Sequence, residues 1–225
     1  MEKTQVDDHP HFYDKTDETL VRTLIEAGTK VRTAESCTGG GLMNRLTDVA
    51  GSSRIMDLSV LAYSPQVKQR LLRVPASRTT DATIVSQETA ECMRKGLAAL
   101  ATMLTGPKTD TCQRTETSAE PDTVEAMNNG NTDGAPGCAE EACWYVGITG
   151  WLGPAPPNAG PELSDTVFVS LECTLLNYTK TFCFSTATIK SASMSKEKIE
   201  QDKATKKRAV VHRILLELVY STTEI

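Results

Sequence analysis

Stretches with the apolar spacing of helices alternate along this chain with short runs that are typical of buried strands. The expected helices are residues 16–27, 37–48, 65–72, 86–104 and 196–220. The expected strands are residues 30–34, 55–63, 144–148, 166–173 and 178–186. This order predicts an α/β protein in which helices flank a mixed sheet, as a three-layer α/β/α sandwich.

Several residues that favour the ends of helices or tight turns mark the limits of these elements. Thr16 suits the N-cap of the first helix, and Gly28 suits its end. Pro65 is expected at the first position of its helix, where a missing N–H group is tolerated. The short gap at Leu176 and Asn177 predicts a hairpin between the last two strands.

The composition changes between residues 106 and 143. This segment has no Leu, Ile, Phe, Tyr or Trp, and it carries eight acidic residues against two basic ones. It cannot bury enough apolar surface to offset the entropy lost on ordering. We therefore expect one domain over residues 16–225, a disordered acidic insertion at 106–143 within it, and a flexible tail at 1–15. The insertion is either a solvated spacer or a docking or modification tract rich in Thr and Ser.

The remaining composition narrows the class of protein. The formal net charge is −5, and no run of Lys and Arg is long enough to indicate a nucleic-acid surface. No window approaches the roughly 20 apolar residues of a membrane span, and the N-terminal residues lack a signal-peptide pattern. Seven cysteines without a CxxC pair favour free thiols in a cytoplasmic protein over disulfides or a zinc site.

A candidate nucleophile, Ser36, lies where an expected strand gives way to a glycine-rich helix start. Free N–H groups at a helix N-terminus attract negative charge, and glycines let a ligand approach the backbone closely. These properties favour Thr38, Gly39 and Gly40 as contacts for an anion or a developing oxyanion. The alternative is that Ser36 or Thr38 is only an N-cap. The segment fits neither the Walker, the GxGxxG nor the GxSxG pattern.

Two further polar residues follow on the next strand and helix. Tyr63 ends the strand, and Lys68 lies in the first turns of the helix that Pro65 begins. Both can face the carboxyl edge of the sheet, where open α/β sheets place their ligands. A lysine shielded from water has a lowered pKa and can serve as the base for a serine. The alternative is a solvated helix lysine and a strand tyrosine without a catalytic role.

Three strings in this region carry a family likeness: Ala-Glu-Ser-Cys-Thr-Gly-Gly at 34–40, Leu-Thr-Asp-Val-Ala-Gly-Ser-Ser at 46–53, and Ala-Tyr-Ser at 62–64 before Lys68. They resemble the C-terminal domain of the competence/damage-inducible protein CinA. Its single-domain bacterial relatives are amidohydrolases of nicotinamide mononucleotide (NMN). Val-Ser-Gln-Glu at 85–88 and Ile-Thr-Gly at 148–150 resemble two further segments of the family.

This resemblance implies a CinA-like fold and the deamidation of NMN to nicotinic acid mononucleotide and ammonia, without a metal or other cofactor. Ser36 would be the nucleophile and Lys68 its base, assisted by Tyr63. Thr149 would contact the substrate from the second loop. The family is commonly oligomeric, so a homo-oligomer is expected, with no nucleic-acid or membrane partner. The full expected substrate-binding set is Cys37, Thr38, Gly39, Gly40, Thr149 and Gly150.

The chain departs from the family after Gly150. The small residues that follow the Thr-Gly pair in the family are replaced by Trp151 and Leu152, and a P-V-G-T-V segment becomes Leu-Ser-Asp-Thr-Val at 163–167. A late G-D-R, whose arginine would meet the substrate phosphate, is absent. Lys190 and Lys196 are the nearest basic replacements in sequence. These differences favour the alternative function, a catalytically silent CinA-like domain that binds a ligand or a protein.

Overall fold

Five strands form one mixed sheet in the computed structural model, which describes residues 15–105, 142–186 and 196–222. The strand order is β2-β1-β3-β4-β5, with β1 parallel to β2 and β3, and with β4 antiparallel to β3 and β5. The strands are β1 (Lys30–Glu35), β2 (Met56–Leu61), β3 (Cys143–Gly150), β4 (Thr166–Cys173) and β5 (Tyr178–Ser185). Because β1 lies between β2 and β3, its carboxyl end lies between those of two parallel neighbours.

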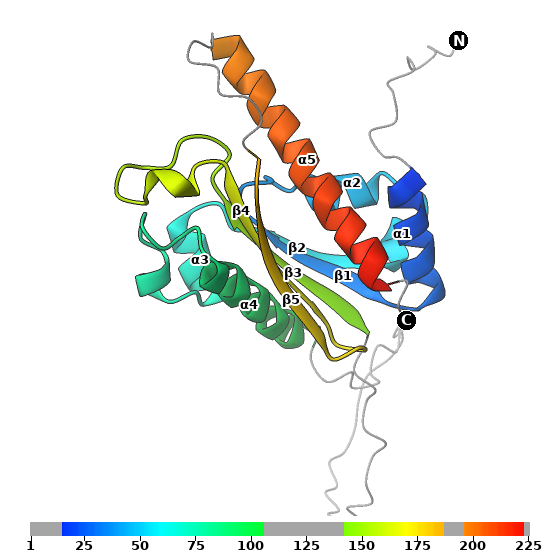
Figure 1. Cartoon of the computed structure of the whole chain (residues 1–225). Coiled ribbons are helices and arrows are strands. Elements are labelled where there is room, and N and C mark those ends of the chain that lie inside the picture. Colours follow the sequence, from blue (N-terminus) through cyan, green and yellow to red (C-terminus); the bar gives the residue numbers. More distant parts are fainter. Residues whose placement is uncertain (1–14, 106–141, 187–195, 223–225) are drawn as a thin grey trace, which may run out of the picture.

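Helices cover both faces of this sheet and make the three layers that the sequence predicts (Figure 1). One face carries α1, α2 and α5, and the other carries α3 and α4. The main helices are α1 (Lys15–Glu26), α2 (Gly41–Thr47), α3 (Pro65–Leu72), α4 (Gln87–Thr105) and α5 (Lys196–Thr222). The expected α/β/α sandwich is confirmed.

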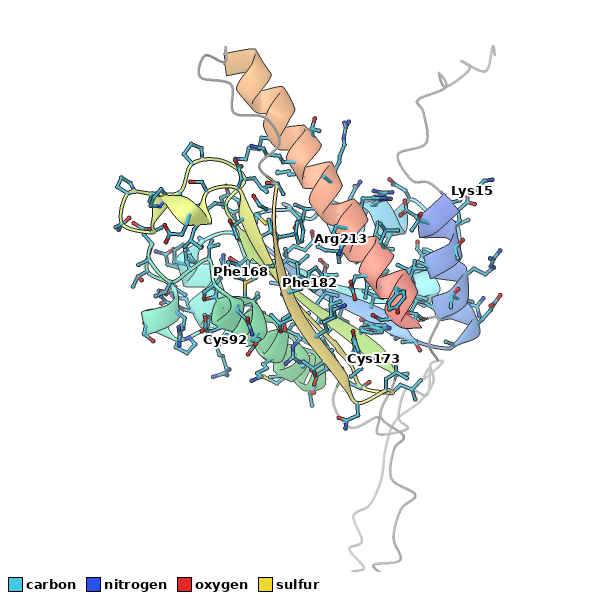
Figure 2. All side chains as sticks on the ribbon, in the orientation of Figure 1. Lys15, Cys92, Phe168, Cys173, Phe182 and Arg213 are labelled. Carbon is cyan, nitrogen blue, oxygen red and sulfur yellow. The ribbon has the colours of Figure 1, made fainter. Side chains whose placement is uncertain are left out.

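Each face of the sheet has its own apolar core because side chains alternate along a strand. Trp144 and Val146 of β3 pack toward α1, α2 and α5, whereas Tyr145 points toward α3 and α4. Phe182 of β5 is partly buried against the first of these cores, in the space between the sheet and α5 (Figure 2). These two cores hold the helices that carry the candidate residues.

Several predicted local features are confirmed. Gly28 follows α1 with φ of 61°, and Asn177 in the β4–β5 hairpin has φ of 49°. Pro65 begins α3, and the side chain of Ser64 caps that helix by accepting a hydrogen bond from the Val67 amide at 3.2 Å. Thr16 is not an N-cap, because α1 already begins at Lys15.

The expected helix over 37–48 is wrong at its start. Residues 37–40 form a turn, and α2 begins only at Gly41. Gly39 and Gly40 have φ of 65° and 85°, in the left-handed region that other residues rarely adopt. The glycines therefore make a sharp turn after β1 and are not the first turn of a helix.

The domain boundaries expected from composition remain a prediction. The expected tail at 1–15 and the insertion at 106–143 lie outside the described residues, apart from Lys15 in α1, residue 142, and Cys143, which begins β3. Cys143 is the first residue of β3 and is fully buried, so this residue belongs to the folded domain.

Candidate active site

Ser36 lies directly after β1, at the carboxyl end of a strand that runs between two parallel neighbours. Ala34, two residues earlier, belongs to the core under α3 and α4. Side chains two apart on extended backbone share a face, so the Ser36 hydroxyl points toward α3 as well. Its side chain is 7% exposed. The strand thus presents a nearly buried hydroxyl at the edge where parallel sheets bind ligands.

Lys68 of α3 reaches this hydroxyl directly. Its Nζ donates a hydrogen bond to Ser36 Oγ at 2.9 Å, and the residue is only 1% exposed. The same amine donates to the carbonyl of Ala62 at 2.6 Å and lies 3.4 Å from that of Tyr63. The structure therefore brings together the predicted nucleophile and its predicted base.

Burial changes the protonation of this lysine. Removing the amine from water penalises its charged form and lowers the Lys68 pKa from 10.5 to about 8. No carboxylate lies among the causes that shift this pKa. The neutral amine is consequently accessible near physiological pH, as a general base for a serine requires.

The packing of α3 against α4 sets the position of Lys68. A Cβ on Gly96 of α4 would lie 1.9 Å from the backbone carbonyl oxygen of Leu72, at the end of α3. Only a glycine allows the two backbones to approach so closely. Gly96 is thus a positioning residue that the sequence pattern did not single out.

Tyr63 stands apart from this pair. Its side chain is 64% exposed, and its phenol makes no hydrogen bond within the part of the chain that the structure describes. Only its backbone carbonyl meets the Lys68 amine. A direct role for the phenol in proton transfer therefore remains a prediction.

Glu35 occupies the N-terminus of α2, directly after the residues 38–40 that were expected to contact a substrate anion. Its fully buried carboxylate accepts hydrogen bonds from the amides of Leu42 at 3.0 Å and Met43 at 2.9 Å. These are N–H groups of the first turn of α2, so the N-terminus of that helix is already neutralised by the chain itself. In the sequence, Glu35 stands out only as a single acid at the end of an apolar strand. Nothing in the residue spacing predicts that it contacts α2.

The other residues of this turn that were expected to contact the substrate have different environments. The Cys37 thiol packs in the core with α2 and α5, and burial raises its pKa to about 12, so it is an inert apolar side chain. The Gly39 amide donates to the Ser36 carbonyl at 3.0 Å, so it holds the turn and is not free for an oxyanion. Thr38 is 2% exposed, and its hydroxyl has no partner among the described residues. Gly40 precedes α2 as its N-cap.

Thr149 and Gly150 end β3, beside Ser36. The parallel register pairs Ala34 with Gly147, so Thr149 is level with Ser36 two residues further on. The Thr149 hydroxyl is buried and donates to the Ile84 carbonyl at 2.8 Å. Its oxygen can still accept a hydrogen bond. Gly150 lies against β4, where a Cβ would approach the Thr166 carbonyl to 2.8 Å.

Asp165, one of the departures from the family pattern, has a structural partner. It adopts φ of 57°, and its carboxylate accepts a hydrogen bond from Lys206 of α5 at 2.8 Å. The acid at a position suited to glycine thus ties α5 to the loop before β4. Lys190 and the side chain of Lys196 lie outside the described residues.

Comparison with known proteins shows that part of this sequence resembles one protein family. Residues 13–106 match the model of the CinA C-terminal domain. A CinA-like protein of Synechococcus sp. is 45% identical over 89 residues, 38% of this chain and 21% of that protein. A CinA-like protein of Geobacter sulfurreducens is 40% identical over 84 residues, 37% of this chain and 20% of that protein. The match thus spans about a fifth of the length of the curated relatives, and the expected resemblance to CinA is confirmed.

The fold is that of solved CinA structures over nearly the whole chain. The competence or damage-inducible protein from Enterobacter asburiae superposes with a TM-score of 0.63 and 19% identity, covering 96% of this chain and 99% of the other. At this identity the likeness establishes the architecture alone. Among the described residues, no helix is long and apolar enough to cross a membrane.

Proposed function

We propose that this chain, whose residues 13–106 match the CinA C-terminal domain, is an amidohydrolase of a pyridine nucleotide. Its reaction would convert NMN and water to nicotinic acid mononucleotide and ammonia. The observation that carries this proposal is the contact of 2.9 Å between Ser36 Oγ and a lysine amine that is 1% exposed. A serine with such a partner is the arrangement of Ser–Lys acyl-transfer enzymes.

The first chemical step follows from this geometry. The neutral Lys68 amine accepts the proton of Ser36 as Oγ attacks the carboxamide carbon, and a tetrahedral intermediate forms. Its pKa of about 8 leaves enough neutral amine at pH 7 for this transfer. The Ala62 carbonyl, which accepts a hydrogen bond from the amine at 2.6 Å, holds Nζ in place as its charge changes.

The second step uses the same proton. The Lys68 ammonium donates it to the leaving nitrogen, ammonia departs, and the acyl group stays on Ser36 as an ester. Water then attacks the ester with Lys68 again as the base, releasing the carboxylic acid and restoring both side chains. In the turn after Ser36, the amides of Gly39 and Gly41 donate to the carbonyls of Ser36 and Thr38, and Glu35 occupies those of Leu42 and Met43. The oxyanion would therefore be bound by the amides nearer Ser36 or by that of Gly40.

One observation favours the second candidate function, a domain that binds a ligand without turnover. The phenol of Tyr63, which the resemblance assigns to catalysis, is 64% exposed and makes no hydrogen bond to Ser36 or Lys68 among the described residues. A domain that had lost its reaction would still bind NMN at the same edge. Binding without ammonia release is the outcome that distinguishes this alternative.

The test is ammonia release from NMN by the full chain, with two serine variants. Ser36→Ala is expected to lower the rate at least about a thousandfold, since it removes the nucleophile. Ser77→Ala, at an exposed serine outside the site, is the matched control and should keep the activity of the unmodified protein. If the unmodified chain releases no more ammonia than Ser36→Ala, the amidohydrolase proposal is wrong.

A further inference from the structure

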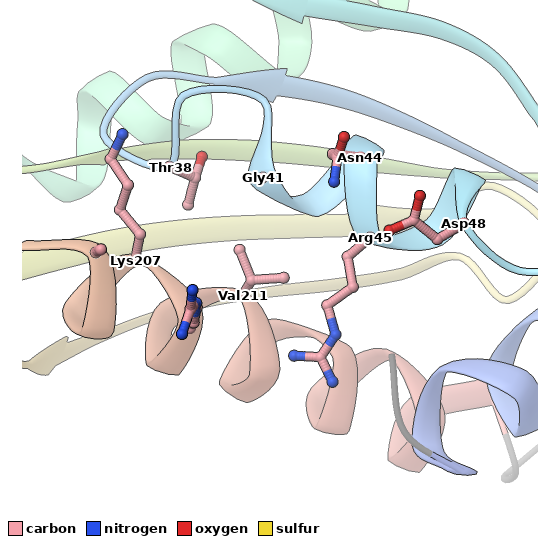
Figure 3. A pocket seen from close by; sticks show the side chains of 9 residues that line it. Thr38, Gly41, Asn44, Arg45, Asp48, Lys207 and Val211 are labelled. Atoms are coloured by element: carbon pink, nitrogen blue, oxygen red, sulfur yellow. The ribbon is translucent and has the colours of Figure 1, made fainter. Parts of the chain in front are cut away.

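A pocket between α2 and α5 lies away from the serine–lysine pair (Figure 3). It encloses about 300 Å³, and Thr38, Lys207 and Val211 are among the residues that line it, whereas neither Ser36 nor Lys68 does. The Ser36 hydroxyl meets Lys68 on the other face of the sheet, under α3 and α4. The residues closest to a substrate amide at Ser36 are therefore those of that second face.

An aromatic residue of β4 lies in the same row as Ser36 on this face. The parallel register makes Ser36 level with Thr149, and Thr149 pairs directly with Phe168. Gly147 shares the face of Thr149 and packs against α4, where a Cβ would lie 2.3 Å from the Ala90 carbonyl oxygen. Phe168, which Figure 2 labels, is half-buried and belongs to neither apolar core of the described residues. It is thus an aromatic side chain near the candidate site that the two cores do not use.

A second aromatic residue, Trp151, lies one step beyond Thr149. Its amide donates to the Thr166 carbonyl at 2.9 Å, so the antiparallel register of β3 with β4 continues by one more residue. Side chains alternate along a strand, which puts Trp151 on the face of Thr149, whereas Leu152 packs against the core of the opposite face. Trp151 and Phe168 are then diagonal neighbours on adjacent strands, at a separation that aromatic side chains can bridge.

The polar end of this indole has no partner. Trp151 is partly exposed as a whole, but its Nε1 is shielded from solvent and makes no hydrogen bond among the described residues. A buried indole N–H normally has an acceptor, so this one gives the fold no stabilising hydrogen bond. Nor does the architecture need an indole here, since the CinA pattern has small residues after the Thr-Gly pair. A contact with a bound ligand therefore explains this side chain better than packing does.

The spacing of the row suits a small aromatic amide. Neighbouring strands lie about 4.8 Å apart, and two residues span about 6.8 Å along a strand. A ring whose carboxamide is at Ser36 therefore passes over Thr149 and reaches Trp151. The ring of NMN is a planar cation, and the face of an indole is the aromatic surface that attracts cations most strongly. Reduced NMN carries the same carboxamide, ribose and phosphate on an uncharged ring, so it would lose this attraction.

We propose that the indole of Trp151 stacks on the cationic pyridinium ring of the substrate, with Phe168 beside it, and so makes the site selective for oxidised pyridinium amides. This inference rests on the proposed amidohydrolase function. Trp151 takes no part in proton transfer, which belongs to Ser36 and Lys68. Its role is to set which amides bind, and reduced NMN is the ligand that it discriminates against.

The experiment measures by calorimetry how NMN and reduced NMN bind to Ser36→Ala protein, which cannot turn them over. NMN is expected to bind about tenfold more tightly than reduced NMN. Adding Trp151→Leu should remove this preference by weakening NMN alone, and Trp151→Phe, which keeps an aromatic face, should retain part of it. Phe184→Leu, at a partly buried aromatic residue on the other face of the sheet, is the matched control and should change neither affinity.

A spectroscopic signal reports the same contact without relying on affinity. The chain has two tryptophans, and Trp144 is fully buried in the core on the opposite face from Trp151. Saturation of Ser36→Ala protein with NMN should therefore quench the indole fluorescence. The same titration of the Ser36→Ala, Trp151→Phe double variant should leave the remaining fluorescence unchanged.

The outcomes separate this inference from the function on which it rests. If the unmodified chain releases ammonia but Trp151→Leu weakens both ligands equally, weakens neither, or tightens NMN binding, the stacking contact is wrong while the enzyme stands. If no ammonia is released but the preference for NMN disappears in Trp151→Leu protein, the contact is supported without the reaction. Absent NMN binding, or quenching that persists in Trp151→Phe protein, overturns it.

Discussion

The lowered pKa of Lys68 makes the pH dependence of the reaction the sharpest test of the proposed mechanism. With a pKa of about 8, roughly a tenth of the amine is neutral at pH 7 and roughly nine tenths at pH 9. We therefore expect kcat/KM to rise about tenfold over this range and then to level off. An unperturbed lysine with a pKa of 10.5 would give a rise of about a hundredfold that continues beyond pH 9.

The assay is initial-rate ammonia release from NMN between pH 6 and 10.5, with protein stability checked at each pH. Lys68→Met should show no activity at any pH, because no other amine meets Ser36 within the described residues. Lys95→Met, at an exposed lysine of α4, is the control and should reproduce the unmodified profile. A profile that is flat between pH 7 and 9, or still rising tenfold per unit above pH 9, would refute the reasoning.

The lowered pKa of Lys68 also predicts how the free energy of unfolding changes with pH, whether or not the protein is an enzyme. Between about pH 8 and pH 10.5 the unfolded chain keeps a proton on Lys68 that the folded chain has lost, so this residue makes the protein more stable as pH rises through that window. Below pH 8 the buried charge disfavours the fold by about 3 kcal/mol. The difference in unfolding free energy between Lys68→Met and the unmodified chain should shrink by up to that amount from pH 7.5 to 10. A constant difference in urea unfolding would refute the shifted pKa.

Two further variants test the elements that position the site. Gly96→Ala should destabilise the fold by about 2 kcal/mol or more, although alanine favours helices, because its Cβ would lie 1.9 Å from the Leu72 carbonyl oxygen. Urea unfolding beside the exposed-site control Lys95→Ala measures it, and a stabilised Gly96→Ala would contradict this packing. Glu35→Gln should lower stability by about 1–3 kcal/mol, since one of the amides of Leu42 and Met43 loses its acceptor. Unfolding free energies within about 0.5 kcal/mol of each other would show that the carboxylate does not hold α2.

The order of helices and strands was predictable because it depends on spacing that neighbouring residues carry. The β4 strand at 166–173 and the start of α3 at Pro65 lie where apolar periodicity and proline preference put them. The start of α2 was not predictable in this way. Glycines suit both a helix start and a left-handed turn, and the choice depends on the Glu35 carboxylate, which caps α2 only once β1 and α2 are packed.

For the candidate site, too, some features were predictable from the sequence and others depended on the tertiary structure. The sequence by itself determined which residues could do the chemistry, because the string at 34–40 and Lys68 carry the family resemblance in their identities and spacing. Only the tertiary structure decided which of them meet. It buries Lys68 against Ser36, leaves the phenol of Tyr63 exposed, and brings Lys207 to Gly39 from 168 positions away in the chain. Desolvation and contact between distant segments are properties of the packed fold, and no local pattern of residues specifies them.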